Sequence, residues 1–243
     1  MTETRTESHS DFYERWSASA RPYFGWQFSQ FAPHIGKRAV DVGCGLGSFV
    51  PHFLEHGVEG YWGVEPDADL RKRFTERHRD PRVRLTAATD ATNPQLAEEM
   101  KALDIDTCFS VNVLEHIERD DLALRHMIGG TKMGGHICLL VPAHPFLYGS
   151  LDRLDHHFRR YTKTTLRELV ARAGGGSVAW VDLYHFNALA AFGWFLKGRV
   201  LKETKQADEN YALMNAVLPF VSRAEKLARP PFGLSLIAIL RRL

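Results

Sequence analysis

Three glycines at alternate positions follow a short apolar run that ends in an acid and a valine. Gly43, Gly45 and Gly47 come after Asp41, and Cys44 lies inside the loop. Glycines let a ligand approach the backbone N–H groups closely, and a helix is expected to begin directly after them. The spacing is GxGxG, not the GxGxxG of dinucleotide sites, and a carboxylate at position 41 would repel a pyrophosphate. This carboxylate suits a ligand that carries an amine or a sulfonium.

A second acid, Glu65, closes the next apolar run, eighteen residues after Gly47. An acid at this point of an open α/β sheet can accept hydrogen bonds from both hydroxyls of a ribose. Together with Asp41, it favours an adenosyl ligand without phosphates. The alternative is a tight strand-to-helix turn in which the glycines only allow close packing. A dinucleotide oxidoreductase is disfavoured by the glycine spacing and by Asp41.

Polar residues that could serve a second substrate follow the fourth and fifth predicted strands. Asn112, Glu115 and His116 follow one strand, and His144 and His157 lie in the loop after the other. Ligands of open α/β sheets gather at the carboxyl ends of strands, so these side chains should border one cleft. We predict His157 as the first catalytic candidate, then His116 and Glu115, and place His144 on the substrate side.

The segment after His157 is basic. Arg159 and Arg160 could form a fork for a carboxylate or phosphate of the substrate, and we predict substrate contacts for both and for Tyr161. The alternatives are a solvated basic surface for the arginine pair, and hydrogen bonds by which His157 and Arg160 brace the loop. For His116, the alternative to a catalytic role is a structural one, in which the residue starts a helix and packs on the sheet.

A metal site is a further interpretation of the same loop. Asp152, Asp155, His156 and His157 are potential ligands, but their spacing is not diagnostic. We therefore assign no metal ligand, and Mg²⁺ stays open as a second cofactor, alongside an anionic substrate.

Two groups of aromatic residues could line a site. One group suggests an apolar pocket for a hydrophobic substrate, with core packing as the alternative: Trp180, Tyr184, Phe186, Phe192, Trp194 and Phe195. The other group precedes the fold and could close over the ligand of the glycine loop, or belong to a helix that covers the sheet: Tyr13, Trp16, Tyr23 and Trp26.

From Arg38 onward, short apolar runs alternate with longer amphipathic segments, which is typical of a parallel sheet covered by helices. Strands are expected at residues 39–42, 61–65, 83–86, 107–111, 136–141, 178–183 and 234–240. Helices are expected at 48–56, 68–78, 94–102, 120–131 and 162–173. The last helix should begin at Thr162 or Thr164 and stop at the glycines 174–176.

The chain has 243 residues, of which 44% are hydrophobic and 25% charged, an ordinary globular composition. This length fits one large α/β domain, or a domain with a cap. From the pattern along the chain we predict a domain over 36–243, a helical cover over 1–35 and a helical insert at about 185–230. The 31 basic and 29 acidic residues give a formal net charge of +2, which supplies no large field for a nucleic-acid backbone.

The cysteines and the apolar segments indicate the cellular compartment in which the protein is expected. Cys44, Cys108 and Cys138 have no spacing typical of a zinc site or a disulfide framework, and the polar first residues lack the core of a signal peptide. A cytoplasmic protein is predicted. The most apolar stretch, 187–196, has ten residues, which is short of the roughly 20 that span a bilayer, so no membrane span is predicted.

The sequence resembles the class I S-adenosylmethionine-dependent methyltransferases over about residues 23–240. The matching segments are 40–47 for the first motif, Glu65 for the acid of the second strand, 112–117 for the motif after the fourth strand and 133–135 for the turn before the fifth. The resemblance implies a Rossmann-like α/β fold: a seven-stranded, mostly parallel sheet with helices on both faces and a helical insert before the last strand.

The resemblance also implies S-adenosylmethionine as the cofactor. In that interpretation Gly43, Gly45 and Gly47 line its methionine and ribose portions, Glu65 holds the ribose and Asp90 contacts the adenine. The cofactor-binding residues that we predict are Asp41, Gly43, Cys44, Gly45, Gly47, Glu65, Asp90, Asn112, Tyr23 and Trp26.

Segments 21–26, 141–162 and 231–236 resemble a narrower branch of small-molecule methyltransferases, often encoded near glycosyltransferase or biosynthetic genes. We expect methyl transfer to a small-molecule acceptor, at oxygen, in secondary or cell-envelope metabolism. C-methylation of a prenyl-type or other hydrophobic anionic substrate is an alternative. A noncatalytic adenosylmethionine-binding protein is another, against which the intact Asp41 and Glu65 argue.

Overall fold

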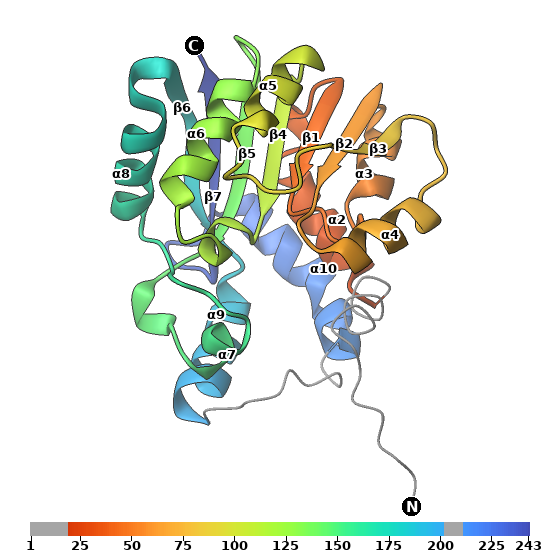
Figure 1. Cartoon of the computed structure of the whole chain (residues 1–243). Helices are drawn as coiled ribbons and strands as arrows, with labels where there is room; N and C mark the ends of the chain where they lie inside the picture. The colour runs from red at the N-terminus through yellow and green to blue at the C-terminus, as the bar shows by residue number, and fades with distance from the viewer. Residues whose placement is uncertain (1–18, 202–210) are drawn as a thin grey trace, which may run out of the picture.

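A seven-stranded sheet forms the centre of the computed structural model, which describes residues 19–201 and 211–243 (Figure 1). The strand order is β3-β2-β1-β4-β5-β7-β6. Neighbouring strands pair in parallel from β3 to β5, whereas β7 is antiparallel to both β5 and β6. The strands are β1 (Arg38–Val42), β2 (Gly60–Val64), β3 (Val83–Leu85), β4 (Thr107–Val111), β5 (His136–Pro142), β6 (Val178–Phe186) and β7 (Ser235–Arg242).

Helices cover both faces of this sheet. One face packs against α5 (Gln95–Ala102), α6 (Asp120–Gly130) and α8 (Lys163–Gly174) through an aliphatic core. The other face packs through aromatic residues against α2 (Arg21–Ser29), α3 (Val50–His56), α4 (Ala68–Arg77) and α10 (Tyr211–Leu227). Strand β2 is buried at every position, as expected for a central strand with helices on both sides.

The structure confirms the predicted α/β class and the positions of the strands. Every predicted strand matches an observed one, and β6 continues beyond its predicted end to Phe186. Helix α8 begins after Thr162, whose hydroxyl accepts a hydrogen bond from the Thr165 backbone N–H at 3.0 Å, and Gly175 follows its last residue. The choice between Thr162 and Thr164 is therefore settled in favour of Thr162.

The described chain between β6 and β7 is helical up to Leu227, and residues 228–234 lead into β7 without regular structure. It contains α9 (Ala188–Phe195), a π-helical segment (Leu196–Val200) and α10. A short helix, α7 (Ser150–Leu154), lies in the loop between β5 and α8 and contacts the π-helical segment. Tyr13 and Trp16, predicted to close over the ligand, lie outside the described residues.

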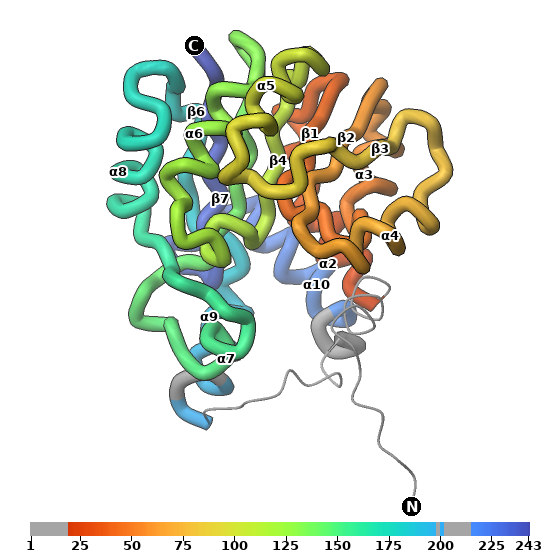
Figure 2. The backbone as a smooth tube through the Cα atoms, viewed as in Figure 1, coloured from red at the N-terminus to blue at the C-terminus, as the bar shows by residue number. Residues whose placement is uncertain are grey.

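The direction of the strands fixes where a site can form. The carboxyl ends of β1 to β5 meet at one edge of the sheet, and α7 and α9 lie beyond that edge (Figure 2). The glycine loop and the loops after β2, β4 and β5 therefore lie on the same side of the molecule. Within the described part of the chain, no helix has the length and apolar character needed to cross a membrane.

Candidate active site

The glycine loop between β1 and α3 has a backbone that only glycine adopts easily. Gly43 has φ +76° and packs so closely that an added Cβ would lie 2.3 Å from a methyl carbon of Val113. Gly45 has φ +54°, but an added Cβ would meet none of the described residues within 4 Å. Gly43 is therefore required for packing, whereas Gly45 borders open space in which a ligand can approach the backbone.

Glu65 joins the end of β2 to this loop. Its Oε2 accepts a hydrogen bond from the Gly45 N–H at 2.9 Å, and its Oε1 accepts one from the Asp67 N–H at 2.9 Å. Burial raises the pKa of Glu65, and the hydrogen bonds from Asp67 and Gly45 oppose that increase. The two amides fix the carboxylate beside the loop, and each oxygen retains a lone pair for a further donor.

Asp41 lies beneath the loop, in β1. It is 2% exposed, and its Oδ2 accepts a hydrogen bond from the Tyr61 hydroxyl at 2.6 Å. Burial raises the pKa of Asp41 to about 7, against the effect of that hydrogen bond. Cys44 is also buried, with its sulfur over Gly63 of β2, so it contributes packing to the loop.

The other predicted cofactor residues lie farther along the same edge. Asn112 follows β4 directly, is exposed and has φ +54°. Asp90 is exposed in the loop after β3, where its Oδ1 accepts a hydrogen bond from the Thr92 N–H at 2.7 Å. Tyr23 and Trp26 contact the end of β6: the Tyr23 hydroxyl accepts from Asn187 Nδ2 at 3.2 Å, and Trp26 packs on Phe186 with ring centroids 4.2 Å apart.

Asp152 is the buried centre of the loop after β5. This fully buried carboxylate accepts hydrogen bonds from Arg160 Nε at 2.6 Å and from the Gly149 N–H at 2.9 Å, and lies 3.0 Å from His157 Nδ1. Trp194 Nε1, from α9, donates to it at 3.3 Å. Burial alone would raise the pKa of Asp152, but the His157 hydrogen bond and the Arg160 charge outweigh burial and lower it to about 2.

The three residues predicted for catalysis lie together. Glu115 and His116 belong to the 3₁₀ turn after β4, and each of Glu115, His116 and His157 offers a ligand atom within 4.8 Å of the others. The rings of His116 and His157 meet edge to face, with centroids 4.6 Å apart. Burial raises the pKa of Glu115 to about 7, and burial together with the nearby His157 lowers the pKa of His116 to about 4.

The residues predicted to contact the substrate have partners within the chain. Arg159 pairs with Asp120 at 2.7 Å, and the Tyr161 hydroxyl donates to the same carboxylate at 2.9 Å. Arg160 is 5% exposed, so the alternative of a solvated basic surface is wrong for this residue. His144 stacks on Phe232, with ring centroids 4.3 Å apart, and its Nε2 is buried without a hydrogen-bond partner.

The role of Asp152 was missed at the sequence level, where it appeared only as one potential metal ligand. The available signal was the spacing of Asp152, His157 and Arg160 within one short segment, which brings opposite charges together around a tight turn. Because its oxygens are engaged by His157, Arg160, Gly149 and Trp194, Asp152 organises the loop around the cluster.

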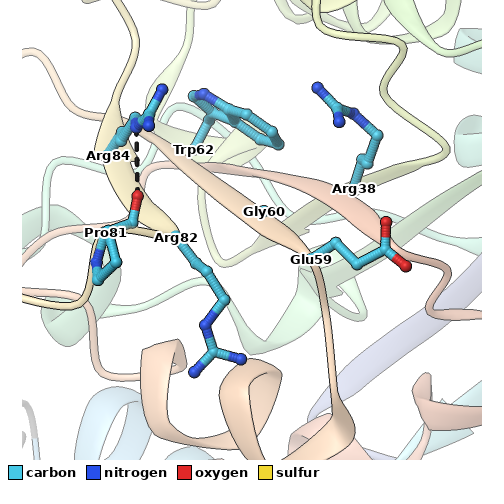
Figure 3. Close-up of a pocket in the computed structure, with 7 residues that line it drawn as sticks. All are labelled: Arg38, Glu59, Gly60, Trp62, Pro81, Arg82 and Arg84. Carbon is cyan, nitrogen blue, oxygen red and sulfur yellow. Dashed lines mark hydrogen bonds between the residues drawn. The ribbon is translucent and has the colours of Figure 1, made fainter.

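A hollow of about 310 Å³ lies at the opposite, amino end of the strands (Figure 3). Trp62 lies between Arg38 and Arg84 there, and the Arg38 guanidinium carbon is 5.1 Å from the centroid of the Trp62 ring. Arg84 Nε donates to the Pro81 carbonyl at 3.3 Å. Since Arg38 begins β1 and the glycine loop follows its other end, this hollow is separate from the candidate site.

The strand order is that of the class I S-adenosylmethionine-dependent methyltransferase fold. Comparisons with known proteins support the same fold class. Residues 19–174 match the sequence family described as "Methyltransferase domain". The chain therefore belongs to the methyltransferase family. Uncharacterized methyltransferases from Mycobacterium bovis and Mycobacterium tuberculosis are 34% identical to it over 134 residues, 53% of this chain and 49% of each relative. The chain spans about half the length of these curated relatives.

Solved structures show the same fold. A SAM dependent methyltransferase from Archaeoglobus fulgidus superposes with a TM-score of 0.60 and 20% identity, covering 97% of this chain and 100% of that one. A geranyl diphosphate methyltransferase in complex with SAM gives a TM-score of 0.63 and 10% identity, covering 99% of this chain and 93% of that one. At these identities the similarity concerns the architecture.

Proposed function

We propose that the chain transfers the methyl group of S-adenosylmethionine to a hydroxyl oxygen of a small-molecule acceptor. The observation that carries this proposal is that two groups of residues share one edge of the sheet. Gly45 borders open space and donates its N–H to Glu65, and it lies on the same side as the cluster of Glu115, His116 and His157. A donor site and an acceptor site are both required, because the reaction is an in-line displacement between two bound molecules.

The residues of the glycine loop suit the donor. Gly45 offers its backbone across open space, Glu65 has lone pairs for the two ribose hydroxyls, and the Asp41 carboxyl favours a neighbouring ammonium or sulfonium. When bound, S-adenosylmethionine supplies an electrophilic methyl group. Asp90 and Asn112, on the adjoining loops, complete the proposed cofactor contacts, with Tyr23 and Trp26 at the end of β6.

The acceptor side depends on a rigid polar cluster. Asp152 holds the Nδ1 edge of His157, which directs the other ring nitrogen away from the carboxylate. The buried ion pair of Asp152 and Arg160 fixes the loop that carries His157. Little conformational entropy is therefore lost when the imidazole is held in position. We therefore place the acceptor hydroxyl at the cluster.

The charges favour a neutral acceptor over an anionic one. Arg159 and Arg160, the cations that could have received a phosphate or carboxylate, are paired with Asp120 and Asp152. Recruiting either guanidinium would break an internal ion pair, and breaking the buried pair of Arg160 would be costly. This argues against C-methylation of a prenyl-type anion at this position.

An acceptor panel tests the proposal. The purified chain is incubated with methyl-labelled S-adenosylmethionine and two sets of acceptors, neutral phenols or alcohols and prenyl-type anions, and labelled products are identified by mass spectrometry. The expected result is an O-methylated product from the neutral set. C-methylation of the anionic set, or bound cofactor with no turnover across a broad panel, would contradict O-methylation.

A further inference from the structure

The cluster of Glu115, His116 and His157 has the composition of a metal site. Two imidazoles and one carboxylate offer one ligand atom each within 4.8 Å of one another. Ligands of a tetrahedral ion at about 2.1 Å lie about 3.5 Å apart, so the three ligand atoms would have to approach one another by about 1.3 Å at most to share one ion.

Glu115 supplies the second observation, because its carboxylate is buried without a hydrogen bond from any other described residue. The residue is 0% exposed, and among the described residues no other residue donates a hydrogen bond to either carboxylate oxygen. Burying a carboxyl group without a partner costs free energy. A cation between Glu115 and the two histidines would remove that cost.

The surroundings of both histidines match the outer shell of a metal centre. His157 Nδ1 lies 3.0 Å from the Asp152 carboxylate, and His116 forms a hydrogen bond with the backbone of Asp155. Histidine ligands in metal sites commonly use their second ring nitrogen in this way, which orients the ring and leaves the other nitrogen for the metal.

We propose that Glu115, His116 and His157 bind one divalent transition-metal ion, of the manganese-to-zinc series. Two nitrogen ligands and one carboxylate suit these ions, whereas magnesium prefers oxygen ligands alone. Three protein ligands leave a position open on the exposed side of His116. An acceptor hydroxyl bound there would release its proton to solvent more readily, and its oxygen could then attack the donor methyl. Only this last step rests on the proposed function.

Cobalt(II) is the probe, because its visible absorption reports on the number and kind of ligands. The chelator-treated chain is titrated with CoCl₂, and Zn²⁺ and Mg²⁺ are added in competition. We expect one bound Co²⁺, displaced by Zn²⁺ but not by Mg²⁺. Glu115→Gln, His116→Gln and His157→Gln should each weaken Co²⁺ binding more than about a hundredfold, and Asp152→Asn about ten- to a hundredfold.

The control is His156→Gln, in the same loop but outside the cluster, which should leave Co²⁺ binding unchanged. Circular dichroism and urea unfolding show whether each variant is folded, and titration with S-adenosylhomocysteine tests the proposed donor site separately. His116 is exposed, so its variant should fold even if Glu115→Gln does not. Failure of the folded chain to bind Co²⁺, or equal binding by wild type and His116→Gln, would overturn the metal site. Failure to bind S-adenosylhomocysteine would count only against the proposed function.

Discussion

Gly45 and Glu65 form the contact on which the proposed donor site depends. The Gly45 N–H is 2.9 Å from Glu65 Oε2, and no side chain of residues 19–201 or 211–243 fills the space that a Cβ at Gly45 would enter. A glycine that serves only packing would be surrounded, as Gly43 is by Val113. At this scale the structure distinguishes between glycines that the sequence presents as equivalent.

Gly45→Ala separates backbone strain from ligand contact, because Gly57 provides a matched control. Both glycines have positive φ, +54° and +88°, and an added Cβ meets nothing within 4 Å at either position. Each alanine should lower the free energy of unfolding by about 1 kcal/mol. Only Gly45→Ala should also weaken S-adenosylhomocysteine binding, about tenfold or more. Urea unfolding and calorimetry measure the two effects, and equal affinities in the two variants would show that the space at Gly45 is not the donor site.

Asp41 predicts a pH dependence of stability. Its pKa is raised from an ordinary value near 4 to about 7, so the folded chain retains a proton that the unfolded chain releases between these pH values. This residue's contribution to the free energy of unfolding therefore falls as pH rises from 4 to 7. Asp41→Asn removes the titration and can still accept the Tyr61 hydrogen bond.

The comparison is made by urea unfolding of wild type and Asp41→Asn at pH 5 and pH 8. Asp41→Asn should gain at least about 1 kcal/mol relative to wild type between the two pH values, since one pKa unit corresponds to about 1.4 kcal/mol. Taking the difference between the two proteins cancels the titration of all other groups. Parallel pH profiles would show that Asp41 is ionised normally in the folded chain.

At the scale of elements, the loop between β5 and α8 carries His157 and the residues that hold it, on the proposed acceptor side. Asp152 in α7 holds Arg160 and His157, and Trp194 from α9 donates to the same carboxylate. Arg160 also donates to the Ala143 carbonyl at 3.1 Å, which ties the far end of the loop to the end of β5. One buried carboxylate therefore joins a loop, a strand end and a helix of the segment before β7.

Asp152→Asn tests this role. The change leaves the buried Arg160 guanidinium without its charged partner, and removing one partner of a buried ion pair typically costs 3–5 kcal/mol. We expect a loss of about 3 kcal/mol in the free energy of unfolding. The control is Asp182→Asn, which breaks the exposed pair with Arg229 and should cost less than about 1 kcal/mol. Similar losses in both variants would contradict a buried centre at Asp152.

The elements were predictable because each strand is a short apolar run bounded by turn residues. Strand β2 illustrates this, since its buried run ends at the acid Glu65. The partners of the loop residues were not predictable. Arg159 and Tyr161 share Asp120, which precedes them by some forty residues, and only the packing of α8 on α6 brings them together. Spacing along the chain gives no information on such pairings.

At the scale of the whole molecule, the proposed donor and acceptor sites are assembled from the two halves of one sheet. The donor site uses the loops after β1 and β2, and the cluster uses the loops after β4 and β5. Because β1 pairs directly with β4, the two sites meet at the centre of the carboxyl edge. Strand β7 pairs antiparallel with β5, so it begins at the carboxyl edge. The helical segment that precedes β7 therefore ends next to the proposed acceptor site.

The most direct test of the account is calorimetric titration of the purified chain with S-adenosylmethionine and S-adenosylhomocysteine, beside Glu65→Ala and, as a control, the exposed Glu76→Ala. The account predicts one site with micromolar affinity, weakened at least about tenfold in Glu65→Ala and unchanged in Glu76→Ala, because Glu65 holds the glycine loop and is the residue proposed to bind the ribose. No binding by the folded wild type, or equal binding by Glu65→Ala, would contradict it.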